Sequence, residues 1–140
     1  MLFRSRFASP WLGEALRFIR INISRNITAA EVCSAVGLSH AAVGAAFRRE
    51  LGRSVQDEIK AVRMEESERL LRSTTLSVRD VAMRSGFGSA SYFCSLFRFA
   101  HGVSPAQWRE NATAKERLSS RKRNGASLQA NRKTRSYMME

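Results

Sequence analysis

Apolar residues recur every three or four positions through most of the chain, a pattern that predicts helices. The longest such run extends from residue 54 to residue 74, with apolar side chains on one side and charged side chains on the rest. Its start is marked by Ser54 with Asp57 three positions later, a helix-capping pair. A helix over this run would be ~30 Å long at about 1.5 Å per residue. With the shorter runs on either side, the pattern predicts an all-α fold of about seven helices.

The segments 27–54 and 76–104, which flank the long run, repeat one another with one extra residue in the second copy. In each copy a hydroxyl residue followed by an acidic residue opens a first helix, a glycine ends it, and a serine opens a second helix. The matched positions are Thr28 and Ser77, Glu31 and Asp80, Gly37 and Gly86, Ser39 and Ser89, Val43 and Phe93, Phe47 and Phe97, and Gly52 and Gly102. Two short helices joined by a tight turn are typical of a helix-turn-helix unit. The repeat therefore predicts two such units, at 28–52 and 77–102, joined by a linker helix at 54–74.

The expected domain spans residues 10–111 and follows a short leader at residues 1–9. Ser9 and Pro10 form a pair that is typical of a helix start, so a first helix is predicted to run from there to about Ser24. Its apolar face predicts that it covers the core of the first unit.

A basic segment at residues 112–140 follows the domain. Ser104 and Pro105 predict a last helix that ends at about Asn111. Beyond it the segment holds eight Lys and Arg residues against two Glu residues, which is half of the chain's net charge of +12. With few large apolar side chains, this tail is predicted to be disordered.

The net charge of +12 suggests an anionic partner, with nucleic acid before a membrane surface, although a basic tail on an ordinary soluble protein would give the same sign. No apolar run approaches the ~18 residues that a membrane span needs. Cys33 and Cys94 are single residues in helical patterns, and neither His40 nor His101 lies at metal-ligand spacing from them. We therefore expect reduced thiols, no metal, no cofactor and a cytoplasmic location.

Two units joined by a long helix, with the second unit reading GFGSASYFCSLFRFAHGVSPAQWR, resemble the DNA-binding domain of the AraC/XylS family of transcription regulators. The resemblance covers about residues 10–110, is most specific between Ser77 and Arg109, and within the family is closest in style to regulators of xylose operons. It implies two homeodomain-like helix-turn-helix subdomains that read neighbouring major grooves of double-stranded DNA. It also implies a bacterial regulator of transcription, with RNA polymerase as a further partner. We expect an activator, although the sequence itself leaves activation and repression open.

In such a unit the second helix enters the major groove, so its outward positions near the N-terminus meet base edges. The expected DNA-binding residues of the first unit are Ser39, His40, Ala41, Gly44, Ala45, Arg48, Arg49 and Arg53; those of the second are Ser89, Ala90, Ser91, Cys94, Ser95 and Arg98. For Arg48 and Arg98 we expect phosphate contact rather than base contact, and Lys60 is a further candidate for phosphate neutralisation. The apolar stripe of each second helix is expected in the core.

Small side chains occupy most of the groove-facing positions, where long polar side chains would give bidentate base contacts worth ~1–3 kcal/mol each. Three hypotheses follow. The small residues let the helices lie deep and read thymine methyl groups and DNA shape, or binding is weakly specific and dominated by phosphates, or this copy of the domain has decayed.

At most ten residues precede the first helix, so neither a ligand-sensing domain nor a small-molecule effector site is expected in this chain. It would then be a stand-alone DNA-binding module or a remnant of a longer regulator. The main hypothesis is a sequence-specific transcription regulator, and the alternative is a weakly specific or non-specific nucleic-acid-binding protein. An enzyme is not expected, because no nucleophile with a base, no carboxylate pair and no phosphate-binding loop is found in the sequence.

Overall fold

The computed structural model describes residues 7–138, and within them the side chains of residues 7–123. Over this range the chain forms seven helices and no strands, which confirms the predicted all-α class. The helices are α1 (Leu12–Ile21), α2 (Ala29–Val36), α3 (His40–Leu51), α4 (Val55–Ser73), α5 (Val78–Arg84), α6 (Ala90–His101) and α7 (Pro105–Met138). Most of the predicted leader, residues 1–6, lies outside the described residues.

Hydroxyl side chains cap the helices from α2 onward, as the sequence predicts. Each capping oxygen accepts a hydrogen bond from the backbone N–H three residues later, at 3.1 to 3.3 Å. The capping residues are Thr28, Ser39, Ser54, Ser77, Ser89 and Ser104. Capping depends on a few neighbouring residues only, which is why the sequence alone locates these helix starts.

The start of α1 differs from the prediction. The helix begins at Leu12 without a side-chain cap, and it ends earlier than expected. Ser9 is engaged elsewhere: its hydroxyl accepts from Arg49 Nη2 at 3.4 Å, and its N–H donates to the Glu50 carboxylate at 3.3 Å. The N–H of Ala8 donates to the same carboxylate at 2.6 Å. Hydrogen bonding from Ser9 and Ala8, with the neighbouring Arg49 charge, holds the pKa of Glu50 below its ordinary value.

The buried side chains fall into two clusters, one for each helix-turn-helix unit. The first joins α1, α2, α3 and the first half of α4, and the second joins the end of α4 with α5, α6 and the start of α7. The predicted stripe residues Val43, Phe47, Phe93 and Phe97 are completely buried, which confirms their place in the core. The axes of α2 and α3 meet at 98°, an angle typical of helix-turn-helix units.

An arginine fastens each unit to the helix that follows it. Arg63 of α4 donates to the backbone oxygen of Ile27 at 3.1 Å and to Asn26 Oδ1 at 3.2 Å. Arg109 of α7 donates to the backbone oxygen of Leu76 at 2.6 Å. Ile27 and Leu76 are matched positions of the repeat, each directly before the capping residue of its unit. Burial lowers the pKa of Arg63, opposed by the interaction with Tyr92.

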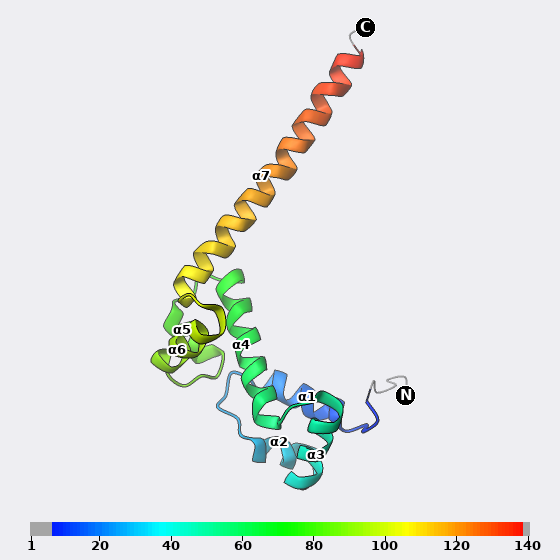
Figure 1. The fold of residues 1–140 in the computed structure, drawn as a ribbon, viewed down its shortest axis with the longest axis vertical. Coiled ribbons are helices and arrows are strands. Elements are labelled where there is room, and N and C mark those ends of the chain that lie inside the picture. The colour runs from blue at the N-terminus through cyan, green and yellow to red at the C-terminus, as the bar shows by residue number, and fades with distance from the viewer. Residues whose placement is uncertain (1–6, 139–140) are drawn as a thin grey trace.

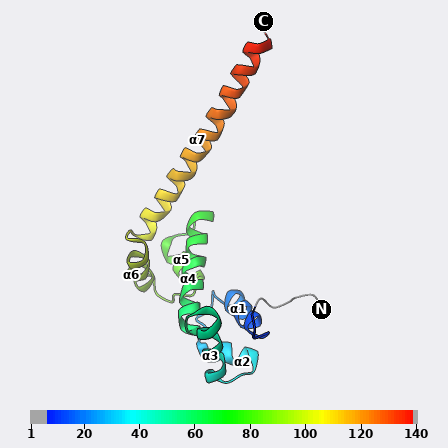
Figure 2. The same ribbon diagram turned by 45° about the vertical axis from the view of Figure 1, so that its right-hand side comes forward.

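Helix α7 continues to Met138, so the predicted end at about Asn111 and the predicted disorder beyond it differ from the structure. Figures 1 and 2 show α7 leaving the two units as a single straight helix. After Pro105 the segment contains no proline and is rich in Ala, Lys and Arg, which favour helix. A helix already nucleated in the core gains one hydrogen bond for each added residue, so it can extend without packing.

Among the described residues, no single helix is both long and apolar enough to cross a membrane. By length and composition alone, the bent pair of α2 and α3 passes the same test. In this structure the larger apolar residues of both helices, Val32, Cys33, Val36, Val43, Phe47 and Leu51, belong to the core of the first unit or pack against it.

Candidate nucleic-acid interface

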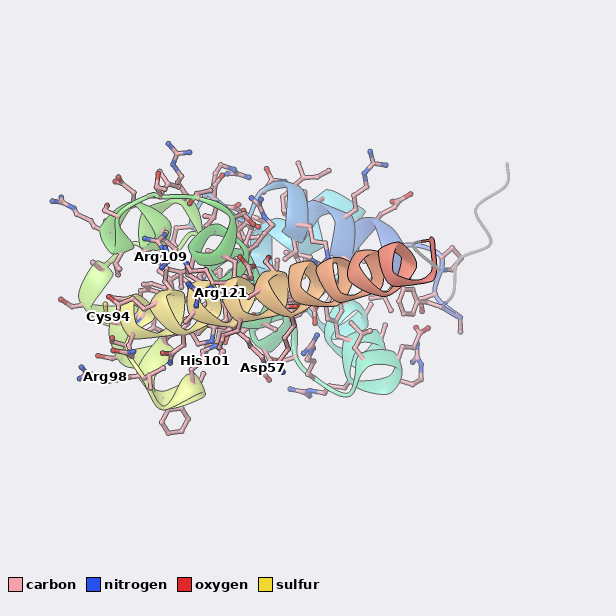
Figure 3. All side chains as sticks on the ribbon, turned by 90° about the horizontal axis from the view of Figure 1, so that it is seen from above. Asp57, Cys94, Arg98, His101, Arg109 and Arg121 are labelled. Carbon is pink, nitrogen blue, oxygen red and sulfur yellow. The ribbon has the colours of Figure 1, made fainter. Side chains whose placement is uncertain are left out.

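The second helices of the two units, α3 and α6, lie on the same side of the molecule. Figure 3 shows both on one side, with Cys94 and Arg98 marking α6, while α1 lies on the opposite side. Figures 1 and 2 show α4 running from the first unit to the second, with α5 and α6 beside its far half. The two helices can therefore face one common partner.

On α3, the expected DNA-binding residues lie on the solvent side of the helix. His40, Ala41, Ala45 and Arg48 are exposed, and Gly44 is half-buried. Ser39 is exposed, and its hydroxyl caps α3 by accepting a hydrogen bond from the Ala42 N–H at 3.2 Å. The outer side of α3 is thus shallow, since its exposed side chains are small except at its two ends.

On α6, the expected residues also lie toward solvent. Ser91, Ser95 and Arg98 are exposed, whereas Ala90 and Cys94 are half-buried beside the core of the second unit. The exposed Ser89 caps the helix through the N–H of Tyr92, at 3.3 Å.

The basic side chains near these helices divide into two groups. Arg49 and Arg53 each have an acidic neighbour: Arg49 lies 3.7 Å from Glu50, and Arg53 pairs with the buried Glu58. Arg48, Arg98 and Lys60 are exposed and make no hydrogen bond or ion pair within the described part of the chain. The free cations are therefore found on both second helices.

Two aromatic residues of α6 are exposed although the sequence predicts no surface role for them. Phe99 is 93% exposed, and Tyr92 is 48% exposed with its ring centroid 6.4 Å from that of Phe87. The signal was present in the spacing, because Phe99 lies two residues after Phe97 and cannot share its side of a helix. The sequence predicts Phe93 and Phe97 in the core, and no prediction is made for Phe99.

Within residues 7–123, where side chains are described, no group of three or more His, Cys, Asp or Glu side chains is placed to hold a metal ion. Cys33 is buried and Cys94 half-buried, and both are free thiols. His101 instead pairs with Glu68 at 2.9 Å and packs on the Phe97 ring, 4.2 Å between centroids.

Comparison with known proteins identifies this arrangement. Residues 32–111 match the model of a family described as a helix-turn-helix domain, which is more than half of the chain. The xylose operon regulatory protein of Escherichia coli (strain K12) is 32% identical over 101 residues, covering 72% of this chain. The chain spans only about a quarter of that relative, 26% of its length.

Two solved structures share the fold closely. The C-terminal domain of AraT, a response regulator from Geobacillus stearothermophilus, is 32% identical with a TM-score of 0.71, over 76% of this chain and 88% of that one. The DNA-binding domain of AdpA, a global transcriptional factor solved with a target DNA, is 25% identical with a TM-score of 0.71, over 76% of this chain and 96% of that one. Since the family model covers most of the first unit and all of the second, the chain belongs to the AraC/XylS family of transcription regulators, whose helix-turn-helix DNA-binding domain it carries.

Proposed function

We propose that this chain is a sequence-specific DNA-binding transcription regulator that inserts α3 and α6 into successive major grooves of one duplex. The observation that carries this proposal is the placement of both helices on one side of the molecule, with their exposed residues outward (Figure 3). An α-helix fits the major groove of B-DNA, so two helices on one side can enter the same duplex.

The length of α4 supports the proposed spacing. Its 19 residues correspond to about 28 Å at 1.5 Å per residue. Successive major-groove faces of B-DNA are about 34 Å apart, so a helix of this length can hold two reading helices about one turn apart. One chain would then read two half-sites, as a dimer of single helix-turn-helix units does.

In the proposed complex the residues of α3 and α6 have distinct roles. The small outward residues Ala41, Ala45, Ser91 and Ser95 would let the helices approach the base edges closely. Arg48 and Arg98, with Lys60, Arg49 and Arg53 beside them, would neutralise phosphates.

The relatives support a role in transcription. AdpA is a transcriptional factor bound to target DNA in its solved structure, and the Escherichia coli relative regulates the xylose operon by its name. We extend this role to the present chain, with RNA polymerase as a further partner and activation of transcription as the outcome. The protein would act in the bacterial cytoplasm, where the genome lies, and DNA binding of this kind requires no catalytic residues.

A second candidate function is weakly specific binding dominated by phosphates. The small side chains on the outer sides of α3 and α6 favour it, because they offer few of the bidentate contacts that distinguish bases.

Selection of bound duplexes from a random library, at about 150 mM salt, separates the two functions. Sequence-specific binding predicts enrichment of a motif with two elements about 10 base pairs apart. Equal binding of a scrambled competitor duplex, with no enriched motif, would replace the specific function by the weakly specific one. Salt must be fixed, since the phosphate contribution to affinity falls steeply with it.

A further inference from the structure

One large aromatic side chain stands on the outer side of α6. Phe99 is 93% exposed, whereas Phe93 and Phe97 of the same helix are completely buried. Two residues correspond to about 200° around an α-helix, so Phe99 points away from the core that holds Phe97. No ring contact to Phe99 is found among the described residues.

Phe99 continues a row of outward residues along α6. Ser91, Ser95 and Phe99 follow one another at four-residue spacing, which places them on one side of a helix, and all three are exposed. The two serines are small, so the phenyl ring is the longest side chain of this row. Arg98, next to it and free of partners within the described residues, provides a positive charge beside the ring.

The chemistry of the ring limits what it can recognise. A phenyl ring neither donates nor accepts a conventional hydrogen bond, and it gains free energy when apolar surface covers it. In the major groove the one methyl group on base edges is the C5-methyl of thymine, and the groups that otherwise distinguish the base pairs there are hydrogen-bond donors and acceptors. Half of the net charge of +12 lies in residues 1–111 rather than in the basic segment, and Arg98 is next to Phe99 on α6. Both favour DNA over a protein as the partner of this side of α6.

We propose that Phe99 contacts the C5-methyl group of a thymine in the major groove read by α6, and so makes the second half-site thymine-dependent. The proposal rests on the proposed function, since it assigns a specificity residue to the helix that would enter the groove. It adds a base preference that the small residues of α6 do not supply.

Replacement of thymine by deoxyuridine tests the contact, because the two bases differ only by the C5-methyl group. Duplexes recovered by selection would be substituted one thymine at a time, and their dissociation constants measured with the full chain and with Phe99→Ala. At one or two adjacent positions of the second half-site, the substitution is expected to weaken binding of the unchanged protein by about threefold to fivefold, the effect of one buried methyl group. With Phe99→Ala the same substitution should have no effect.

Two controls make the result specific. Leu118→Ala removes another exposed apolar side chain, 59% exposed on α7, and should retain the full uracil penalty. Phe99→Leu keeps an apolar side chain and should retain part of it. Thermal melting of Phe99→Ala should match that of the unchanged protein, because an exposed ring supports no core.

The outcomes separate this contact from the proposed function. Equal uracil penalties for Phe99→Ala and the unchanged protein would overturn the contact while DNA recognition stands. If Phe99→Ala bound every duplex with the affinity of the unchanged protein, the thymine contact would also be overturned. The exposed ring would then be assigned to a protein partner. Failure of the unchanged protein to select any motif would overturn the proposed function and the contact with it.

Discussion

Gly86 lies where the second unit touches the loop that follows α1. Its φ is +83°, and a Cβ at this position would come within 2.1 Å of the Ile23 backbone oxygen and 3.1 Å of the Arg25 backbone oxygen. The residue is therefore required for two reasons, a left-handed backbone and the absence of a side chain. This close approach is one of the contacts that fix the second unit against the first.

Gly86→Ala should destabilise the protein by more than about 3 kcal/mol, since the left-handed backbone alone costs roughly 1–2 kcal/mol and the oxygen of Ile23 must also move. Gly88→Ala is the matched control, because Gly88 has a φ of +72° with open space where the Cβ would lie. It should lose only the backbone part. Urea unfolding followed by circular dichroism compares the two, and equal losses would contradict a close approach at Gly86.

Arg48 and Arg98 are the free cations of α3 and α6, so their effect on DNA binding should be that of phosphate contacts. Each change to Ala should weaken binding to all sequences alike and reduce the slope of log K against log salt by about 0.9. The matched control is Arg17→Ala, an exposed arginine of α1, the helix that lies on the opposite side of the molecule from α3 and α6 (Figure 3). Fluorescence anisotropy at several salt concentrations measures the slopes, and a loss at Arg17 as large as at Arg48 would refute the proposed orientation.

At the scale of the helices, the sequence predicts the features that depend on residues a few positions apart, such as helix starts and helix ends. The duplicated caps and glycines locate α2 to α6 because each involves residues a few positions apart, and the apolar stripe separates Phe47 and Phe97 from the solvent side. The predicted start of α1 was wrong because the Ser9 side chain contacts α3 instead of capping α1. The exposed Phe99 was missed although its spacing of two residues from the buried Phe97 places the two rings on different sides of the helix.

The hydrogen bonds of Arg63 and Arg109 could not be predicted from the sequence either, since they join residues more than thirty positions apart. Arg63→Met should remove the hydrogen bonds to Ile27 and Asn26 and cost about 1–2 kcal/mol, below the upper range for charged hydrogen bonds because the side chain is only half-buried. On the same helix, Arg69→Met breaks an exposed pair with Glu66 and should leave the stability nearly unchanged. Urea unfolding distinguishes the two, and equal midpoints would mean that Arg63 does not hold the loop.

At the scale of the whole molecule, the two units behave as one body only if α4 and the contacts beside it stay intact. Arg63 and the close approach at Gly86 both act on the loop between α1 and α2, from α4 and from the second unit respectively. The loop thus joins three parts of the molecule. If the relative orientation of α3 and α6 is fixed, the affinity for DNA should depend strictly on the distance between the half-sites. Two units that moved independently would tolerate several distances.

Helix α7 places charge far from that reading side. Its 34 residues extend for about 51 Å at 1.5 Å per residue, and half of the net charge lies beyond residue 112. Electrostatic interactions are screened over about 8 Å at physiological salt, so a helix that leaves the two units contributes little to a duplex held by α3 and α6 (Figures 1 and 2).

A chain shortened after residue 112 should therefore keep its melting temperature, since residues 113–123 are exposed. It should also keep the affinity and salt slope for a selected duplex near 150 mM salt, about the physiological value. Below about 10 mM salt, where the screening length reaches roughly 30 Å, its binding to random DNA should weaken. Arg48→Ala in the shortened chain is the internal control, because it should reduce the slope there as it does in the full chain. A fall of several units in the slope on shortening alone would mean that α7 lies on the bound duplex, and the docking orientation would then have to turn toward the C-terminal helix.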